Sequence, residues 1–393
     1  MSAYFIEAFD TLFFRDGRPF EIGGYANLQI PPSPSNFYGA IRSALITSKP
    51  GGFEKIKTNQ DETLRAVVGE IGDSEGETAK LQINGPLFAR MASKGITGYF
   101  PVPRDLLVYS VDGKGANKLN RKFIIQNKLK ELPKGVETNS STRMFLINPY
   151  AESMSSEELL LSDGTFARYL NGDLKFPFEI DYNLNAIQVE QLFKSDYREG
   201  IALKSKQKNV EKSRLFTMQH LEFDNDPDEP YGFVLEIHNN SIELGEPAYL
   251  RLGGDGKVAQ MIRVDINWGN VDNIKEKIDS NKLFKVYIAT PAIFELGWKS
   301  KAMHNGYFDE YPGLEFELLT AAFGRSEMYG GYDIVANVPK VSFPAVPAGS
   351  VFYFKLKKGT ADDVIAAFHQ KCISDYRNKQ GFGYSFVGGI TNV

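Results

Sequence analysis

The sequence contains a single cysteine, Cys372, so no disulfide can form within the chain, and nothing indicates an oxidising compartment. Histidines are also few. His220, His238, His304 and His369 stand far apart, without the spacing of three or four residues that would place two metal ligands on one helix face. Since a cysteine pair for zinc is missing too, we expect no bound metal.

Long apolar runs are missing as well. No stretch approaches the roughly 18 apolar residues that a membrane helix requires. The first seven residues, MSAYFIE, lack the basic region and the long apolar run of a secretory signal peptide. These absences predict a cytoplasmic protein that does not associate with a membrane.

Two glycine-containing loops resemble nucleotide-binding motifs but lack essential residues. Gly256-Lys257 would end a P-loop only with glycine at 251 and serine or threonine at 258, where the chain has Arg251 and Val258. Gly381-Phe382-Gly383 would need a third glycine at 386 to bind a dinucleotide, and Phe386 stands there. We therefore expect no cofactor and no catalytic residues, and predict that the protein is not an enzyme.

The net charge is −4, but the basic residues are unevenly distributed. Residues 112–134 hold seven lysines and arginines, and residues 198–214 hold six. An acidic run follows at 222–229. Such runs are typical of solvated loops, and a basic run is also typical of a nucleic-acid contact.

The chain of 393 residues predicts two or three domains, and its last third has the clearest pattern. Thr360-Ala361-Asp362-Asp363 predicts the capped start of a helix whose apolar face extends to Cys372. The expected elements are, in order, a strand over 283–289, a helix over 315–323, strands over 332–338 and 350–356, this helix, and a strand over 384–390. This βαββαβ order predicts a ferredoxin-like domain with both helices on one face of a four-stranded antiparallel sheet.

The N-terminal part begins in a similar way. The expected elements are a strand over 4–14, a helix after the rigid segment Pro31–Ser35, strands over 81–88, 98–109 and 231–238, and a hairpin over 247–266 with its tip at 253–256. Polar segments at about 111–142 and 195–230 interrupt the pattern as insertions. The predicted fold class is therefore α+β, with two ferredoxin-like (RRM-like) βαββαβ domains, one over 1–265 and one over 275–393.

Several residues have the chemistry of single-stranded RNA recognition, in which bases stack on aromatic faces and cations hold phosphates. Aromatic residues lie beside basic ones at Phe14-Arg15, at Tyr38 with Arg42, and at Phe323 with Arg325. Two loops combine cations with closely spaced glycines, a pattern typical of phosphate binding and equally of tight turns. They contain Arg251, Gly253, Gly254 and Lys257, and Arg377, Lys379, Gly381 and Gly383.

An ordered series of short motifs from residue 4 to about 390 resembles one protein family. The motifs are Phe14-Arg15-Asp16-Gly17-Arg18-Pro19-Phe20, Pro32-Ser33-Pro34-Ser35 with Tyr38-Gly39-Ala40-Ile41-Arg42, Tyr99-Phe100-Pro101-Val102-Pro103-Arg104-Asp105, Arg251-Leu252-Gly253-Gly254-Asp255-Gly256, Thr290-Pro291-Ala292-Ile293-Phe294, Gly297-Trp298, Gly330-Gly331-Tyr332-Asp333, Pro339-Lys340, Pro347-Ala348-Gly349-Ser350-Val351 and Gly381-Phe382-Gly383. The series resembles the third-subunit family of the Cmr complexes, type III-B CRISPR effectors, within the RAMP superfamily.

The resemblance implies two ferredoxin-like domains and a non-catalytic subunit that helps to anchor the 5′ repeat tag of the guide RNA. The implied partners are the guide RNA, the large polymerase-like subunit and the first backbone subunit. Gly381-Phe382-Gly383 matches the glycine-rich loop of the superfamily, and Arg198–Leu203 resembles the family's basic inserted stretch. The residues predicted to bind RNA are Arg15, Arg18, Ser35, Tyr38, Arg42, Arg198, Lys204, Lys206, Arg251, Gly253, Gly254, Lys257, Arg377, Lys379, Gly381, Phe382 and Gly383.

Two alternatives remain open from the sequence. Related RAMP proteins cleave repeat RNA, so the chain could be a guide-processing endoribonuclease, with His220 or His238 as the proton carrier that metal-independent cleavage needs. The chain could also be a scaffold that contacts other subunits and little RNA.

Overall fold

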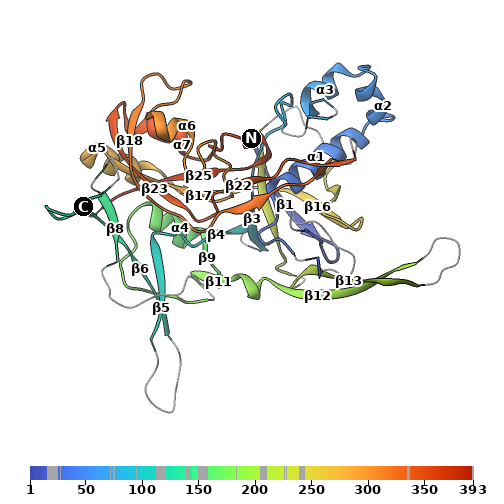
Figure 1. Cartoon of the computed structure of the whole chain (residues 1–393), viewed down its shortest axis with the longest axis horizontal. Helices are drawn as coiled ribbons and strands as arrows, with labels where there is room; N and C mark the ends of the chain where they lie inside the picture. Colours follow the sequence, from blue (N-terminus) through green and yellow to red (C-terminus); the bar gives the residue numbers. More distant parts are fainter. Residues whose placement is uncertain are drawn as a thin grey trace, which may run out of the picture.

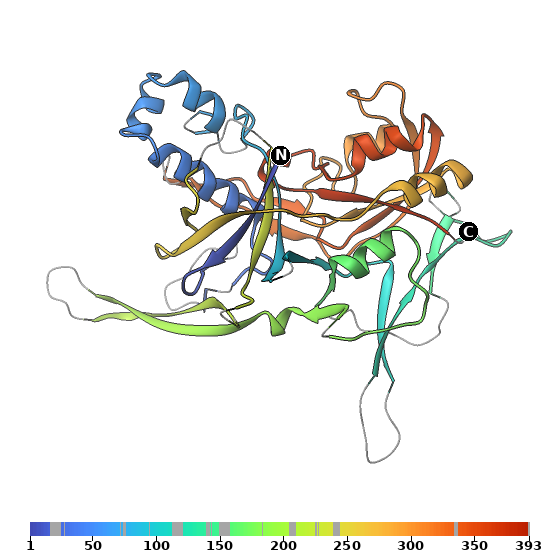
Figure 2. The ribbon, with the colours of Figure 1, turned by 180° about the vertical axis from the view of Figure 1, so that it is seen from behind.

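The computed structural model describes residues 1–15, 25–26, 28–70, 72–73, 76–93, 95–111, 121–138, 142, 144–148, 158–182, 184–203, 210–224, 226, 228–238, 244–333 and 337–391. Figures 1 and 2 show two main β-sheets with helices packed around them. Most neighbouring strands in these sheets are antiparallel, so the chain is a mixed α and β protein built on antiparallel sheets.

The eight-stranded sheet takes all its strands from the N-terminal two thirds of the chain, and neighbouring strands in it run antiparallel. Its strand order is β11 (Ala186–Gln188), β9 (Leu159–Ser162), β4 (Gly95–Pro101), β3 (Ile83–Ala92), β14 (Tyr231–Ile237), β1 (Ser2–Ala8), β16 (Val258–Val264) and β15 (Ala248–Arg251). The strands expected at 4–14, 81–88 and 231–238 and the hairpin at 247–266 are therefore confirmed, with shifted ends.

The expected strand at 98–109 is instead two strands in different sheets. β4 ends at Pro101, and β5 (Leu106–Val111) begins a second sheet with β6 (Arg121–Gln126) and β10 (Phe178–Glu179). Pro101 and Pro103 explain the break, because a proline has no N–H group for a ladder hydrogen bond.

The five-stranded sheet belongs to the C-terminal third. Its order is β18 (Glu315–Ala322), β23 (Val351–Lys358), β17 (Leu283–Ile288), β25 (Tyr384–Gly389) and β24 (Lys371–Cys372). The strands expected at 283–289, 350–356 and 384–390 are confirmed. Thr360 caps α7 (Ala361–Phe368) through the predicted capping box with Asp363.

The prediction of a helix over 315–323 is wrong, because residues 315–322 form strand β18. Its residues pair with β23, and Phe316 packs against Phe354 and Phe368. Pairing and burial override a helical composition in such a case. The expected strand over 332–338 is also wrong. Tyr332–Asp333 (β20) and Val338–Pro339 (β21) pair only with each other, and residues 334–336 lie outside the described part.

Cys372 was expected on the apolar face of a helix, and this is wrong too. α7 ends at Phe368, and Gln370 then has a φ of 56°, which turns the chain into the short strand β24. The Cys372 Sγ lies 3.3 Å from Asn84 Oδ1. Burial raises the pKa of this thiol above its ordinary range, so the side chain packs as an unreactive group.

The remaining helices cover different parts of the sheets. α5 (Asp272–Asn281) and α7 contact each other and β25, whereas α4 (Asp163–Leu170) contacts β4, β9 and β25 and so lies between the two sheets. α1 to α3 follow one another at the N-terminal end of the sequence. Their bounds are α1 (Pro34–Thr47), α2 (Gly52–Lys57), α3 (Glu62–Val68), α4 (Asp163–Leu170), α5 (Asp272–Asn281) and α6 (Lys301–Asn305).

Both segments expected as insertions form strands. The segment 111–142 contains β6 and β7 (Lys128–Glu131), and β7 pairs with β8 (Met144–Ile147). The segment 195–230 contains most of a long hairpin, β12 (Phe193–Leu203) with β13 (Val210–Phe223), next to the short β2 (Tyr25–Ala26). This hairpin extends away from the body of the molecule in both views (Figures 1 and 2).

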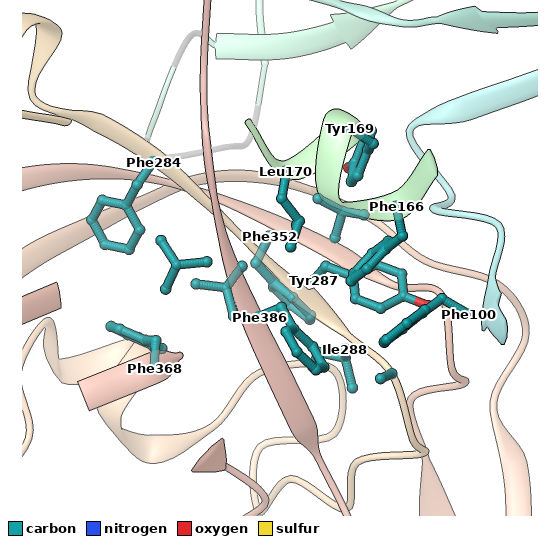
Figure 3. Packing of buried hydrophobic residues seen from close by; sticks show 14 of the residues in the cluster. Phe100, Phe166, Tyr169, Leu170, Phe284, Tyr287, Ile288, Phe352, Phe368 and Phe386 are labelled. Atoms are coloured by element: carbon teal, nitrogen blue, oxygen red, sulfur yellow. The ribbon is translucent and has the colours of Figure 1, made fainter. Parts of the chain in front are cut away.

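One aromatic core joins the two sheets through α4. Phe166 of α4 stacks on Phe100 of β4, with ring centroids 4.0 Å apart, and meets Phe386 of β25 edge-on at 5.5 Å. Figure 3 shows this helix and the strand residue Tyr287 facing each other across the core. The Tyr287 hydroxyl donates to the Pro101 carbonyl (2.7 Å), so the core also contains a hydrogen bond between the two halves.

Candidate functional site

The glycine-rich loop follows a short 3₁₀ turn, Asn378–Gln380, and lies where the two halves meet. Gly381 and Gly383 have φ values of 94° and 73°, which favour glycine. A Cβ atom on Gly381 would overlap the carbonyl oxygen of Gly85 in β3. The Thr290 hydroxyl donates to the Gly381 carbonyl at 2.6 Å. The sequence therefore needs glycine here for a close approach between backbones.

Side chains of this loop also join the halves. Lys379 Nζ donates to the carbonyls of Glu77 (2.7 Å) and Ala79 (2.8 Å). The Ser35 hydroxyl donates to Gln380 Oε1 at 2.6 Å. The predicted RNA-binding residues Ser35, Lys379 and Gly381 are thus brought together, and each contacts another part of the same chain.

Arg377 and Phe382 lie inside the protein. Arg377 is only 4% exposed. Its guanidinium donates a hydrogen bond to the Val341 carbonyl (3.1 Å) and lies 5.1 Å from the centre of the Phe343 ring. Phe382 is fully buried. Direct RNA contact by either side chain would require the loop to rearrange, so their RNA-binding role stays a prediction.

Tyr38 and Arg42 lie on α1, and the rest of the chain engages both. Tyr38 is buried, and the loss of water raises the pKa of its hydroxyl to about 12. Arg42 donates to the carbonyls of Val68 and Glu70, both at 2.6 Å, and so fixes α1 to the end of α3. These contacts give the two residues a structural role, and their RNA contact stays a prediction.

A second group of predicted residues meets at the turn between β15 and β16. The Gly254 N–H donates to the Phe13 carbonyl at 2.8 Å, and Gly253 packs against the same carbonyl. Lys257 Nζ pairs with Asp10 at 2.8 Å. Arg198 of β12 pairs with Asp196 at 2.7 Å and donates to the Thr11 hydroxyl at 3.1 Å. The base of the long hairpin and the glycine turn therefore share the segment 10–13.

The solvent face beside this turn carries residues that the sequence analysis missed. Phe9 and Tyr249 are 58% and 60% exposed, and their rings stack with centroids 5.9 Å apart. Tyr249 and Arg251 are two residues apart on β15 and share its exposed face, whereas Ala248 and Leu250 are buried. Apolar and polar or aromatic residues alternate along Ala248–Arg251, and this alternation was the sequence signal that would have placed Tyr249 on the same face as Arg251.

The other predicted residues are accounted for briefly. Arg15 is exposed and forms an isolated bridge with Leu28. Arg18, Lys204 and Lys206 lie outside the described residues.

The two histidines considered for catalysis are buried or partly buried. His220 stacks on Phe13 at 5.1 Å, and its Nδ1 lies 3.3 Å from the Thr11 hydroxyl. Burial lowers the pKa of His220, with a further contribution from the nearby Arg198 and Lys257, and burial likewise lowers the pKa of His238. A neutral, enclosed imidazole of this kind suits packing, since a proton carrier must reach the substrate.

The described residues were also compared with the requirements of a small-molecule cavity, a metal site and a membrane-spanning helix. A cavity of about 290 Å³ lies between the halves, with mainly proline and aliphatic walls and with Arg104, Glu158 and Glu327 as its charged residues. In the described ranges no group of three or more His, Cys, Asp or Glu side chains could hold a metal ion. Among the helices described there, none combines the length and the apolar character needed to cross a membrane.

Comparison with known proteins identifies the family. The model of the family described as "CRISPR-associated protein (Cas_Cmr3)" matches residues 4–388. The chain is also similar to chains in cryo-EM structures of the Type III-B Cmr-beta bound to cognate target RNA, with AMPPnP (TM-score 0.45) and without it (TM-score 0.48). Each match has 15% sequence identity and covers 89% of this chain and 86% of the other. A search of curated proteins found no match.

The family match extends over nearly the whole chain, including both sheets, the glycine-rich loop and the turn between β15 and β16. The chain therefore belongs to the Cas_Cmr3 family of CRISPR-associated proteins, components of type III-B Cmr complexes.

Proposed function

We propose that the chain is a non-catalytic RNA-binding subunit of a type III-B complex, located in the cytoplasm. In this proposal it helps to anchor the 5′ repeat tag of the guide RNA and docks on the large polymerase-like subunit and a backbone subunit. The observation that carries the RNA-binding role is the exposed face formed by Phe9, Tyr249 and Arg251, which we call the β15 face.

The β15 face combines the two chemistries that single-stranded RNA requires. The stacked rings of Phe9 and Tyr249 offer an exposed surface to a base, and this contact tolerates any base identity. Arg251 lies on the same side of the strand and supplies a charge for phosphate. Lys257 lies at the adjoining turn, and Arg198 lies on the nearby strand β12, although Asp10 and Asp196 offset part of the charge of these two residues. β15 is the last strand in the described order of its sheet, so this face lies at a sheet border.

Replacing Tyr249 with alanine should weaken binding of the guide tag by the assembled complex by about 1–3 kcal/mol, the contribution of one stacked base. Arg251→Ala should instead weaken binding to all sequences and reduce the slope of log K against log salt by about one. Binding isotherms at several salt concentrations measure both effects.

Tyr307→Ala provides the matched control, because Tyr307 is a tyrosine of the C-terminal half with a similar exposed fraction of 46%. It should leave affinity and salt slope unchanged. If Tyr249→Ala and Arg251→Ala bound the tag as tightly as the unmodified complex, the β15 face would not be an RNA contact.

We also propose that the two halves are ferredoxin-like domains with the boundaries 1–265 and 275–393. In the five-stranded sheet the order β18-β23-β17-β25 is that of strands 2-3-1-4 in a βαββαβ chain, which supports the assignment for the C-terminal half. Only the short α6 (Lys301–Asn305) stands at the position of the first helix there, and α5 packs beside α7 instead.

A further inference from the structure

A second pair of stacked aromatic rings is exposed on the C-terminal half. Trp298 and Phe323 are 41% and 44% exposed, and their rings lie 5.6 Å apart at an angle of 19°. Phe323 stacks in turn on Phe352 of β23, which is fully buried, at 6.5 Å and 16°. The three nearly parallel rings form a column that begins in the core and ends at the surface with Trp298.

The fold holds this column in place from both ends. Phe294 meets Phe352 edge-on at 6.1 Å in the core. Phe323 directly follows strand β18, and Gly297, with a φ of 82°, turns the chain just before Trp298. Because the rings are already ordered, a planar group that stacks on them would lose little binding energy to ordering of the side chains.

A hollow lies beside the two exposed rings. It has a volume of about 310 Å³ and is lined by Trp298, Phe323, Gly324, Pro344 and Pro347, among others. A flat, mostly apolar group can therefore enter next to the aromatic column and be covered on more than one side.

The charges around the hollow favour an anionic occupant. Lys299 Nζ lies 5.4 Å from the centre of the Trp298 ring, and Arg325 is exposed two residues after Phe323. The guanidinium of Arg104 lies close to Gly324, 3.6 Å from the position that a Cβ atom there would take. The nearby carboxylate of Glu295 is paired with Lys301 at 2.5 Å.

We propose that Trp298 and Phe323 form a stacking site for an unpaired nucleobase of single-stranded RNA, with Lys299 and Arg325 next to its phosphates. The inference rests on the proposed RNA-binding function and adds a second contact, built from elements other than those of the β15 face. An apolar side chain of a protein partner could also fill the hollow, but the surrounding cations would give such a contact no benefit.

Trp298 can report on its own occupancy. The chain has two tryptophans, and the other, Trp268, is buried in the core, where it meets Phe100 edge-on at 5.3 Å. In the full chain carrying Trp268→Phe, Trp298 is the sole source of tryptophan fluorescence. A single-stranded oligoadenylate, whose bases are unpaired, should quench this fluorescence, whereas an abasic oligomer of the same length, with the same phosphates and no bases, should not.

Trp298→Ala supplies the second readout. It should weaken oligoadenylate binding at least about fivefold, which is the smallest effect expected from one stacked base, and leave binding of the abasic oligomer unchanged. Tyr307→Ala is the control for removal of an exposed aromatic ring from the same half of the chain. Should Trp268→Phe fail to fold, fluorine NMR of the unsubstituted chain with fluorotryptophan resolves the two residues and replaces the fluorescence readout.

Three results would overturn the inference while leaving the proposed function intact. The first is RNA binding with no response of Trp298 and no effect of Trp298→Ala. The second is equal quenching by the abasic oligomer, which would indicate phosphate binding without stacking. The third is a Trp298→Ala chain that binds RNA normally but fails to enter the assembled complex, which would assign the hollow to a protein partner. Failure of the proposed function would differ, since the complex would then bind its RNA without any contribution from this chain's β15 face or aromatic column.

Discussion

Asp105→Ala should lower the free energy of unfolding by about 3–5 kcal/mol, the usual effect of removing one partner from a buried ion pair. Asp105 is fully buried and accepts hydrogen bonds from the hydroxyls of Tyr169 (2.8 Å) and Tyr353 (2.5 Å). Lys285 Nζ lies 4.0 Å from the same carboxylate. The Gln126 side-chain amide donates to this carboxylate as well, at 3.3 Å. The substitution therefore leaves two hydroxyls, one amide and one ammonium group without their acceptor in the core between α4, β17 and β23.

Lys285 adds a pH dependence to this prediction. Its ammonium group lies 3.3 Å from the centre of the Tyr169 ring, and burial lowers its pKa to about 8, although the Asp105 carboxylate acts in the opposite direction. Between pH 8 and the ordinary lysine pKa near 10.5, the unfolded chain binds more protons than the folded chain. The contribution of Lys285 to stability should therefore rise with pH across this interval.

Urea unfolding at a series of pH values tests both statements. Relative to Lys285→Met, the unsubstituted chain should gain stability between pH 8 and 10, and the comparison of the two chains removes the effect of tyrosine ionisation that they share. Combining Asp105→Ala with Lys285→Met should restore part of the lost stability, because no uncompensated charge remains. The exposed pair Asp279 and Lys282 is the control, and Asp279→Ala should change stability by less than about 1 kcal/mol. If Asp105→Ala and Asp279→Ala lowered the free energy of unfolding equally, the buried network around Asp105 would contribute no more to stability than an exposed ion pair.

Gly381→Ala should also destabilise the chain strongly, by about 2–5 kcal/mol. A left-handed backbone costs a residue with a Cβ atom about 1–2 kcal/mol, and overlap with packed neighbours adds about 1–3 kcal/mol. The neighbour here is the backbone carbonyl of Gly85, which cannot turn aside as a flexible side chain could. Chemical denaturation of the full chain measures the effect.

Gly256→Ala separates the two contributions. Gly256 has a φ of 63°, but a Cβ atom there would meet nothing within 4 Å, so only the backbone term of about 1–2 kcal/mol applies. If both alanine variants lost the same stability, the close approach of Gly381 to β3 would not hold the two halves together as described.

Local sequence signals predicted much of this fold correctly. The capping box at Thr360, the apolar strands of the C-terminal sheet and the glycine turn at 253–256 are all present. Each depends on residues close together in the chain. The segment 315–322 has a helical composition, and only its pairing with β23, about 35 residues later, makes it a strand.

The candidate site was harder to predict because its contacts also join residues that are far apart in the chain. Lys379 and Arg377 have the chemistry of phosphate binding, but their acceptors are carbonyls at Glu77, Ala79 and Val341, which no local pattern indicates. Conversely, Phe9 and Tyr249 become neighbours only when β1 and β15 join the same sheet. Composition identifies residues that can bind RNA, and tertiary contacts decide which of them are exposed.

The position of β1 in its sheet has a consequence for protein synthesis. Ser2 lies opposite Ile237, and Ala3 lies opposite Val264, so β1 pairs with two strands, β14 and β16, that are synthesised more than 200 residues after it. At a synthesis rate of about 5–20 residues per second, β1 waits roughly 15 to 50 seconds for both partners. During this time its apolar residues Phe5 and Ile6 remain exposed to chaperones and to other nascent chains. The length of chain between β1 and β16 thus sets a minimum time before the sheet can close.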